Sequence, residues 1–462
     1  MKPAPLPLEI SIDPSKAADT IGDDFVGLSY ETEQVLPNAK GTHYFRPDNK
    51  PLITLFKTIG VKNLRIGGNS VDRIVTGIPG PTDIDQLFAF ARAVGAKVIY
   101  SVRLQDGEAQ SAADIVKHIY DHHADLLDCF AIGNEPAYYK PYDNFRGKWR
   151  TIMEAIIAVV PQATFCGPDT NPDPAWCKSM VDEFGKSGPM SMLTVHNYPG
   201  DCSYKNPGAK KVEDLVPKDA AVAREQMLSS AWYAIYAKVQ KGMADAVAGT
   251  PLPFRLAETN NFWYGGLKGA SDSYASALWS ADYLYWYASH GAKGLNFHTG
   301  DRVGGGETTL TSRYTAFVTT GNGYEIRPLS YGMKLFDLGG HGKLIPLTLS
   351  SEAGDGVSAY ATLSANQLLT VTLINKTHAA GAKEAAITLK LKSPSKPSSA
   401  RTISMTEADG NVEANFGITI GGQPIQSDGS WTGQWKPLNI SGAGDIAVNV
   451  APASATVVSV QL

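Results

Sequence analysis

The sequence predicts a (β/α)8 barrel followed by an all-β sandwich. Over the first three hundred residues, eight short strand-like runs alternate with helical patterns. After Arg327-Pro328 the helical periodicity largely stops, and alternating strand-like runs fill the rest of the chain. Eight is the number of βα units that closes such a barrel. A doubly wound open sheet is the alternative, but it normally carries a Gly-rich phosphate turn after an early strand, and this sequence has none.

Each predicted barrel strand is a short apolar or β-branched run that ends in polar residues, which is typical of a strand buried in a parallel sheet. The strands are expected at Phe25–Ser29, Asn63–Ile66, Lys97–Arg103, Phe130–Ile132, Thr164–Gly167, Met192–His196, Phe254–Ala257 and Gly294–Phe297. Apolar residues with a helical period fill most intervals. They predict helices at Asp83–Val94, Ser111–His123, Lys148–Val159, Ala220–Val247 and Ser271–Ser289.

The sandwich is predicted from runs that alternate with a period of two and are separated by turn signals such as Ser427-Asp428-Gly429. The N-terminal run Leu8–Ile12 is also strand-like, and we expect it to pair with this domain because chain ends often lie close together. The barrel is therefore expected over residues 20–326, and the sandwich over residues 1–19 and 327–462. The other strands of the sandwich are expected at Val357–Leu363, Leu368–Ile374, Ala386–Leu391, Ala400–Met405, Ile446–Val450 and Ala455–Gln461.

The composition excludes several classes of protein. The 462 residues include 41 Lys+Arg and 45 Asp+Glu, a net charge of 41 − 45 = −4 without basic blocks, which argues against nucleic acid as a partner. No apolar run approaches the roughly 18 residues of a membrane span. The four cysteines form no CxxC pair, and they permit two disulfides without requiring them. The opening Met1–Pro5 carries no hydrophobic signal region. We expect a secreted or periplasmic protein whose signal peptide is removed, with a cytoplasmic one as the alternative, and the oligomeric state stays open.

Polar or ionisable residues follow nearly every predicted barrel strand. Active sites of this fold gather at the C-terminal ends of the strands. Loop polarity alone explains any one of these ends, but it explains eight in a row poorly, because buried polar groups are costly. The ends are, in order, Tyr30-Glu31, Gly67-Gly68-Asn69, Gln105-Asp106, Gly133-Asn134-Glu135-Pro136, Pro168-Asp169, His196-Asn197-Tyr198, Glu258-Thr259-Asn260 and His298.

Two of these residues, Glu135 after the fourth strand and Glu258 after the seventh, lie nearly opposite each other across the mouth of a closed barrel. Cleavage of a glycosidic bond requires such a pair, since one carboxyl group protonates the leaving oxygen and the other attacks the anomeric carbon. A separation of about 5–5.5 Å implies retention through a covalent intermediate. Taken alone, Glu135 is also explained as a capping or ion-paired residue. The pair favours hydrolysis of glycosides.

The residues around this pair resemble known families. Ile132–Pro136 and Ala257-Glu258-Thr259 resemble the large clan of retaining glycosidases with (β/α)8 barrels. Within this clan, Leu64–Asn69, His196-Asn197-Tyr198 and Gly265-Gly266 resemble glycoside hydrolase family 79. That family contains β-glucuronidases and heparanases, and it combines a barrel with a β-sandwich built from the C-terminus and an N-terminal strand. The resemblance covers essentially the whole chain.

By position, the resemblance implies that Glu135 is the general acid/base, that Glu258 is the nucleophile and that Asn134 binds the sugar 2-hydroxyl. It also implies that Glu31 and Asn69 touch the sugar ring.

The same resemblance places Tyr198 beside the nucleophile, where it holds the carboxylate in position. His196 and His298 lie outside any HExxH-type spacing, so we expect both to form hydrogen bonds in the cleft and His196 to be one of the substrate-binding residues. Neither a metal nor an organic cofactor is expected.

The sugar carboxylate of a glucuronide is expected to bind to tyrosine hydroxyls and backbone amides, as the resemblance implies. Tyr264 matches the position of one such tyrosine if this chain has one extra residue after Glu258. Without that extra residue, Trp263 occupies the matching position. Tyr314 is the expected second tyrosine. Arg313 directly before it is expected either to pair with the carboxylate through two hydrogen bonds, to block the pocket or to face solvent.

Other residues have simpler explanations. Arg65, inside the second strand, is expected to form an ion pair at the barrel mouth and to orient a catalytic carboxylate. The aromatic run from Trp279 to Tyr287 is expected to pack in the core. For Tyr138, which follows the acid, both packing and stacking on a leaving group stay open. Gly304–Gly306 is expected to be a flexible loop.

The expected function is that of a retaining exo-β-glycosidase, foremost a β-glucuronidase, acting on a small-molecule or oligosaccharide glycoside. One alternative is a β-glucosidase or β-xylosidase with the same two glutamates. Another is an endo-acting, heparanase-like enzyme, although a polyanionic substrate would favour a cationic groove that this sequence lacks. A non-catalytic carbohydrate-binding protein is the alternative from a different class.

Overall fold

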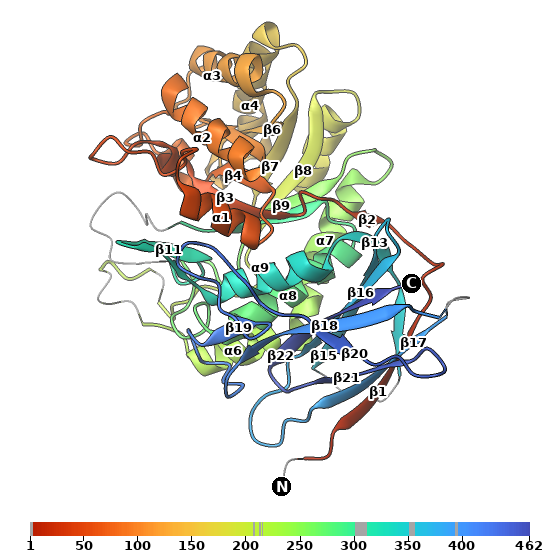
Figure 1. Cartoon of the computed structure of the whole chain (residues 1–462). Helices are drawn as coiled ribbons and strands as arrows, with labels where there is room; N and C mark the ends of the chain where they lie inside the picture. The colour runs from red at the N-terminus through yellow and green to blue at the C-terminus, as the bar shows by residue number, and fades with distance from the viewer. Residues whose placement is uncertain are drawn as a thin grey trace.

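A computed structural model describes residues 3–206, 208–211, 214, 216–300, 312–350, 356–392 and 396–462. It confirms the expected barrel with a β-rich C-terminal domain, which lie one above the other in Figure 1. The predicted glycine loop, Gly304–Gly306, lies outside the described residues.

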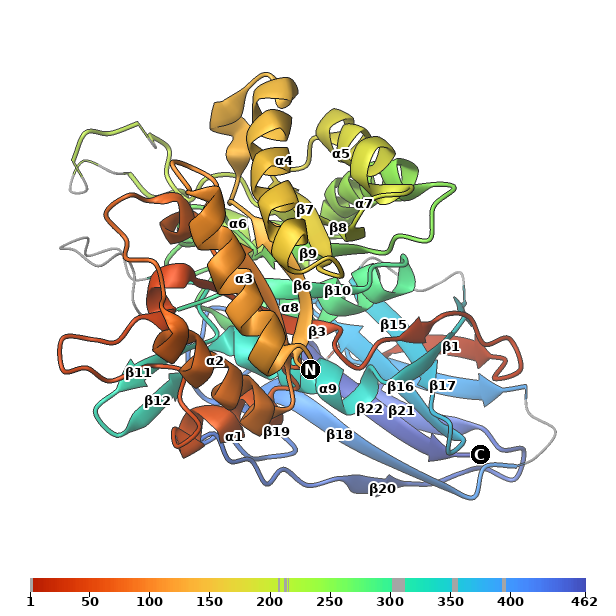
Figure 2. The ribbon, with the colours of Figure 1, turned by 90° about the horizontal axis from the view of Figure 1, so that it is seen from above.

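Eight parallel strands close the barrel, with the last strand pairing with the first. The strands cover the predicted positions and are almost entirely buried, because side chains fill the inside and helices cover the outside (Figure 2). They are β3 (Val26–Glu31), β4 (Asn63–Gly67), β5 (Lys97–Val102), β6 (Leu127–Ile132), β7 (Phe165–Thr170), β8 (Met190–Asn197), β9 (Phe254–Thr259) and β10 (Gly294–His298).

Several of these helices begin at side-chain caps or at prolines, for example α5 at Asp173, whose carboxylate accepts two backbone N–H groups. The single helix predicted over Ala220–Val247 is wrong: Ser229 is extended and caps a short turn, Ser230–Trp232, that separates α6 from α7. The helices are α1 (Lys50–Thr58), α2 (Pro81–Val94), α3 (Ala109–His123), α4 (Tyr142–Val159), α5 (Pro174–Met180), α6 (Ala220–Leu228), α7 (Tyr233–Val247), α8 (Tyr274–Ser289) and α9 (Pro328–Gly339).

Helix α8 is buried from Tyr274 to Ala288, because it lies between the barrel and the sandwich with α9 beside it (Figure 1). The predicted aromatic run is part of this core. One carboxylate, Asp282, is buried there; it accepts hydrogen bonds from Lys376 Nζ at 2.8 Å and from the Tyr233 hydroxyl at 2.6 Å. This ion pair joins a barrel helix to the C-terminal domain.

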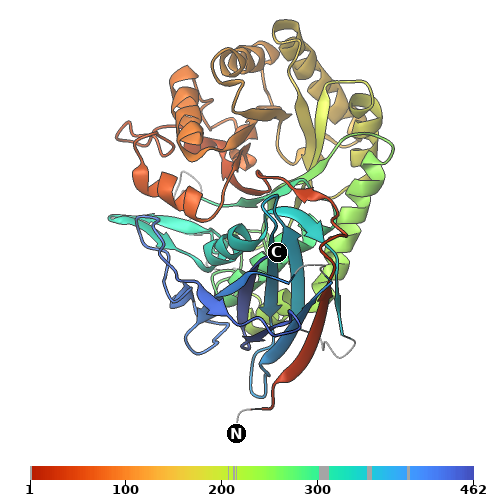
Figure 3. The same cartoon turned by 45° about the vertical axis from the view of Figure 1, so that its right-hand side comes forward.

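The C-terminal domain has a four-stranded and an eight-stranded sheet, in the orders β14-β1-β17-β21 and β19-β18-β22-β16-β15-β13-β2, with β20 beside β18. The N-terminal strand β1 pairs with β17 and β14, as expected (Figure 3). The strands are β1 (Leu6–Ile12), β2 (Thr20–Ile21), β13 (Gly342–Ile345), β14 (Leu347–Leu349), β15 (Val357–Leu363), β16 (Leu368–Asn375), β17 (Ala385–Leu391), β18 (Ser399–Glu407), β19 (Ile418–Ile420), β20 (Lys436–Leu438), β21 (Ile446–Val450) and β22 (Ser454–Gln461).

The boundary predicted at residue 20 is displaced in the structure. Strand β2 pairs with β13 of the large sheet, so Thr20–Ile21 belong to the sandwich, and the chain enters the barrel just before Val26. A separate hairpin, β11 (Phe317–Thr320) with β12 (Gly323–Ile326), follows the barrel.

All four cysteines, Cys129, Cys166, Cys177 and Cys202, are free and buried. Within the described parts of the chain, no helix combines the length and the apolar character needed to cross a membrane.

Candidate active site

A cleft of about 760 Å³ opens at the C-terminal ends of the barrel strands. Both predicted catalytic glutamates face it, together with five of the eight predicted substrate-binding residues: Glu31, Asn69, Tyr198, Tyr264 and Tyr314. Its lining consists of Glu31, Glu33, Asn69, Arg73, Glu135, Asn171, Pro172, Asn197, Tyr198, Glu258, Trp263, Tyr264, Gly265, His298, Thr299, Gly300, Ser312 and Tyr314.

The two glutamates converge across the cleft. One carboxylate oxygen of Glu135, one of Glu258 and one ring nitrogen of His196 all lie within 4.8 Å of one another. Retaining glycosidases hold their carboxyl groups about 5–5.5 Å apart, whereas inverting enzymes leave about 6.5–9.5 Å for a water molecule. The side chain of Glu258 is 9% exposed and that of Glu135 is 29% exposed. The arrangement therefore fits a retaining mechanism with one enclosed and one accessible carboxyl group.

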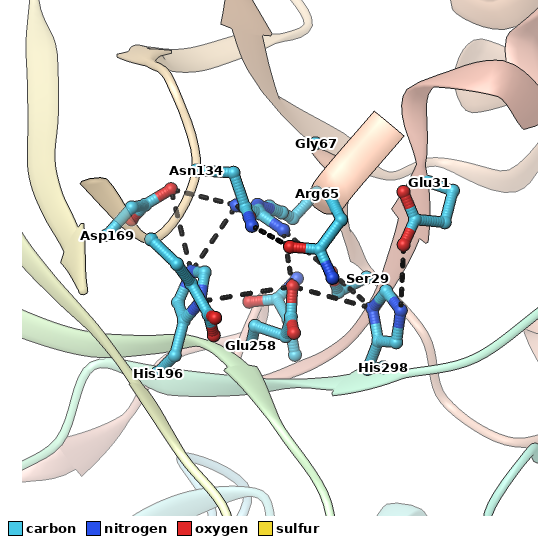
Figure 4. A network of polar contacts seen from close by, with 12 residues as sticks. Ser29, Glu31, Arg65, Gly67, Asn134, Asp169, His196, Glu258 and His298 are labelled. Carbon is cyan, nitrogen blue, oxygen red and sulfur yellow. Dashed lines mark hydrogen bonds and ion pairs between the residues drawn. The ribbon is translucent and has the colours of Figure 1, made fainter. Parts of the chain in front are cut away.

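Arg65, in the middle of β4, is fully buried, and its guanidinium lies among the side chains of Asn134, Asp169 and Glu258 (Figure 4). Its Nη1 donates to Glu258 Oε2 at 2.8 Å, and its Nη2 donates to Asn134 Oδ1 at 2.8 Å and to Asp169 Oδ2 at 3.0 Å. A Cβ at Gly67 would approach the guanidinium carbon at 2.5 Å, so this position has no room for a side chain. The guanidinium forms ion pairs with two buried carboxylates, those of Asp169 and Glu258. Arg65 therefore forms the predicted ion pair at the barrel mouth and orients the carboxylate of Glu258.

Glu258 is held from several sides. The Tyr198 hydroxyl donates to its Oε1 at 2.8 Å, and His298 Nδ1 lies 3.6 Å from its Oε2. Burial alone would raise the pKa of Glu258, but the charges of His298, His196 and Arg65 and the hydrogen bond from Tyr198 lower it to about 2. The carboxylate is therefore ionised at any working pH, as a nucleophile requires.

Glu135 lies at the end of β6 in a left-handed backbone conformation, with φ 44°. Such a residue costs about 1–3 kcal/mol and is typical of functional sites. Its backbone N–H donates to the carbonyl of Asp169 at 2.8 Å, which holds the turn in place. Its Oε1 lies 3.0 Å from His196 Nδ1.

His196 is a fully buried side chain that connects the two glutamates with Asp169. Its Nε2 lies 3.8 Å from Asp169 Oδ2. Burial would lower the pKa of His196, but the charge of Glu258 and hydrogen bonds with Asp169 and Glu135 raise it to about 9. As an imidazolium it donates to Glu135 rather than lining the cleft for substrate. The structure thus places His196 behind the catalytic groups, a correction to the expectation that it binds substrate.

The close approach of Glu135, His196 and Glu258 also has the spacing of a metal-binding cluster. The surroundings do not fit a cation, because the Arg65 guanidinium already donates to Glu258 Oε2 at 2.8 Å and lies 3.3 Å from His196 Nε2. These residues form a hydrogen-bonded charge network.

The positions expected to touch the sugar are fixed by hydrogen bonds. Glu31 Oε2 accepts the backbone N–H of Ser70 at 2.7 Å, and its Oε1 lies 3.7 Å from His298 Nε2. Burial would raise the pKa of Glu31, but the interactions with His298 lower it. Asn134 is buried, and its Nδ2 donates to Asn69 Oδ1 at 3.1 Å. Glu31 and Asn69 face the cleft side by side with His298.

Sequence reasoning missed Asp72, which organises three loops of the site. Its Oδ1 accepts the backbone N–H groups of Leu104 at 2.7 Å and Gln105 at 3.0 Å. Its Oδ2 accepts the N–H of Asn134 at 3.0 Å and the hydroxyl of Tyr138 at 2.8 Å. The only signal in the sequence is its place in the loop after the second barrel strand. Tyr138 is thereby held beside the acid and is half exposed.

The aromatic residues expected around a sugar carboxylate lie on the other side of Glu258. Trp263 and Tyr264 both line the cleft, at 41% and 44% exposure, so either of them can occupy the position of the first expected carboxylate-binding tyrosine. Tyr314 is buried, with its ring 5.9 Å from that of Tyr198. Arg313 is not placed with them: its guanidinium faces Asp272 at 4.0 Å, and it is absent from the described lining of the cleft. Its side chain turns away because Ser312 and Tyr314, on either side, face inwards.

The barrel, its C-terminal β domain and the two convergent glutamates define a glycoside hydrolase. Residues 359–457 match the family model described as "Glycosyl hydrolase family 79 C-terminal beta domain". This match confirms the resemblance to glycoside hydrolase family 79. No curated protein sequence is similar enough to this chain to count as a match.

Several solved structures share the complete architecture. A 4-O-α-L-rhamnosyl-β-D-glucuronidase from Fusarium oxysporum 12S is 17% identical with a TM-score of 0.72, over 98% of this chain and 100% of that chain. A GH51 arabinofuranosidase from Xanthomonas axonopodis pv. citri is 13% identical with a TM-score of 0.69, over 98% and 99%. A monomeric β-xylosidase from Caulobacter crescentus CB15 is 15% identical with a TM-score of 0.64, over 98% and 99%. At these identities, the likeness shows a shared fold.

Proposed function

We propose that this protein is a retaining exo-β-glycosidase and that terminal β-D-glucuronides are its preferred substrates. The observation that carries the mechanism is the close approach of an enclosed, ionised Glu258 and an accessible Glu135, with oxygens within 4.8 Å. The family 79 β domain and the fold shared with a glucuronidase support the choice of sugar.

In the first step, a carboxylate oxygen of Glu258 attacks the anomeric carbon while the bond from that carbon to the leaving oxygen breaks. Glu135 gives its proton to the leaving oxygen, and a glycosyl ester forms on Glu258. In the second step, Glu135 takes a proton from water, the water oxygen attacks the anomeric carbon, and the ester bond breaks. The sugar leaves with its original β configuration.

Three groups around Glu258 support these steps. Tyr198 and Arg65 each donate to one oxygen of the carboxylate, so its orientation is fixed before the sugar arrives. Asn134 is held by Arg65 and Asn69 beside the acid, where its amide suits the sugar 2-hydroxyl. Hydrogen bonds to that hydroxyl strengthen in the transition state.

The preference for a glucuronide rests on Tyr264, Gly265 and Tyr314, which border the cleft on the side of Glu258. Hydroxyls and a backbone amide are donors suited to a carboxylate. A β-glucosidase or β-xylosidase is the second candidate, and the exposed indole of Trp263 at the same edge favours it, because an apolar ring suits a sugar without a charged group.

The mechanism is tested by the stereochemistry of the first product and by variants of both glutamates. Proton NMR of a fresh reaction should show the β anomer first; the α anomer would refute retention. Glu258→Ala should abolish turnover, and added azide should restore it with formation of an α-glycosyl azide. Glu135→Ala with azide should give the β-glycosyl azide instead. Activity of Glu258→Ala near that of the wild type would contradict the assignment.

The sugar is tested with 4-nitrophenyl β-D-glucuronide, β-D-glucoside and β-D-xyloside at matched concentrations. We expect the highest kcat/KM for the glucuronide. A preference for another sugar would leave the assignment of the two glutamates unchanged and would contradict the proposed binding of a sugar carboxylate. Shortening of heparan or hyaluronan without release of monosaccharide would replace exo action with endo action. Sugar binding without turnover of any aryl glycoside would identify a binding protein.

A further inference from the structure

Two helices on the outside of the barrel bring together three side chains that the glycosidase mechanism does not use. Asp85 comes from α2, and His118 and His123 come from α3, which lies beside α2 (Figure 2). Asp85 Oδ1 lies 2.8 Å from the Nε2 atoms of both histidines. One ligand atom of each residue lies within 4.8 Å of the other two.

We propose that Asp85, His118 and His123 form a binding site for one divalent transition-metal ion of the zinc type. Two imidazole nitrogens and one carboxylate oxygen are a donor set that suits Zn²⁺, with metal–ligand distances of about 2.0–2.2 Å. Ligands on a tetrahedral ion at that distance lie about 3.4 Å apart. Each Nε2 lies 2.8 Å from Asp85 Oδ1 and the three atoms lie within 4.8 Å of one another, so rotations of the side chains would bring them to this spacing.

The present hydrogen bonds show how an ion would enter. A carboxylate only accepts hydrogen bonds, so each histidine now directs an Nε2–H at the same oxygen of Asp85. Binding moves each of these protons to Nδ1 or releases it to solvent, and the freed Nε2 lone pairs then bind the ion. One cation takes the place of two protons that share one acceptor.

The neighbours of the cluster hold the rings in position and leave a path for the ion. The ring of Phe88 stacks on His123, with centroids 4.7 Å apart and an angle of 6°. The side chains of His118, His123 and Asp85 are 20%, 15% and 49% exposed. The donors therefore remain accessible from solvent, and water can complete the coordination.

The ion would stabilise the barrel rather than take part in hydrolysis. Its three ligands join adjacent helices, and none of them is among the described residues that line the cleft. A ligand that binds the native state and not the unfolded chain stabilises the native state by RT ln(1 + [L]/Kd), so the melting temperature should rise as the Zn²⁺ concentration is raised above the Kd.

The test uses the full chain, freed of metal by a chelator and dialysed. Isothermal titration with ZnCl₂ should show one ion per chain, and Co²⁺ should give the visible absorption of a low-symmetry site with nitrogen and oxygen ligands. His118→Ala and His123→Ala should each weaken binding at least tenfold, and Asp85→Asn should also weaken it. His122→Ala is the matched control: this histidine neighbours the cluster on α3, its Nδ1 lies 2.9 Å from the His118 carbonyl, and its loss should leave affinity unchanged.

Two results of these titrations would contradict the proposal. Absence of one-to-one binding at 100-fold excess of Zn²⁺, Ni²⁺ or Cu²⁺ would overturn it. Unchanged stoichiometry and affinity in the His118→Ala, His123→Ala double variant would assign any bound ion to another place. Hydrolysis by these variants at the wild-type rate without metal shows that they fold. A Zn²⁺-dependent rise in melting temperature that is present in His122→Ala and lost in His123→Ala would support the proposal independently.

Discussion

The charge on His196 should make the stability of the protein depend on pH in the alkaline range. The pKa of this buried imidazole is raised from 6.5 to about 9, because the charge of Glu258 and hydrogen bonds with Asp169 and Glu135 outweigh the cost of burial. A group whose pKa is raised by folding contributes stability that is complete below the unfolded value. That contribution is lost as the pH rises through the folded value.

The magnitude follows from the shift. A difference of about 2.5 pKa units, at 1.36 kcal/mol for each unit, corresponds to about 3 kcal/mol. The free energy of unfolding should therefore fall by about this amount between pH 6 and pH 10 on account of His196 alone. The attraction between His196 and Glu258 raises the pKa of the one and lowers the pKa of the other, so the lowered pKa of Glu258 adds no separate stability from this pair.

Equilibrium unfolding in urea at pH 6, 8 and 10, followed by tryptophan fluorescence, measures this difference in the wild type and in His196→Asn. Other groups titrate in both proteins, so the difference between the two pH profiles isolates the imidazolium. His341→Asn removes an exposed histidine and should leave the profile of the wild type unchanged. Parallel profiles for the wild type and His196→Asn would refute the argument, since they would mean that His196 is neutral throughout.

Three further changes test the network and the domain interface. Arg65→Ala leaves Glu258 buried without its ion pair, and the free energy of unfolding should fall by about 3–5 kcal/mol; a melting temperature equal to that of the wild type would contradict this. Tyr198→Phe removes a hydrogen bond to the Glu258 carboxylate that is worth about 1.5–3 kcal/mol, so the free energy of unfolding should fall by about this amount, and kcat should fall because the carboxylate is no longer held in position; unchanged stability and kcat would contradict this. Lys376→Met leaves Asp282 unpaired between the two domains and should lower stability by about 3–5 kcal/mol in urea unfolding while KM stays constant; a change in KM with normal stability would show that this ion pair acts on the cleft.

The fold and the convergence of Glu135 and Glu258 could be predicted from local sequence because both depend on signals within single βα units. Each barrel strand is a short apolar run, and Glu135 and Glu258 directly follow such runs. Knowing only that eight strands close a barrel is enough to place both glutamates at one mouth. The break between α6 and α7 escaped prediction because Ser229 interrupts a pattern whose apolar period continues on both sides.

The support around the glutamates could be predicted only in part, because its partners are far apart in the chain. Arg65 contacts Asp169 and Glu258, which are 104 and 193 residues away, and closure of the barrel alone brings them together. Asp72 likewise acts on loops whose positions depend on other strands. Whether the Arg313 side chain points into the cleft or toward Asp272 depends on the conformation of one loop, which the sequence pattern does not specify.

The distribution of charge differs between the two glutamates and suits the roles proposed for them. Arg65, His196 and His298 all lie on the side of Glu258, and its two oxygens are enclosed by donors. This enclosure favours the ionised form and fixes the orientation of the carboxylate. Glu135 contacts His196 alone within this set, and its side chain stays open to the cleft, where a leaving group and then a water molecule must exchange. An acid/base has to gain and lose a proton in each cycle, so access matters more for Glu135 than permanent charge.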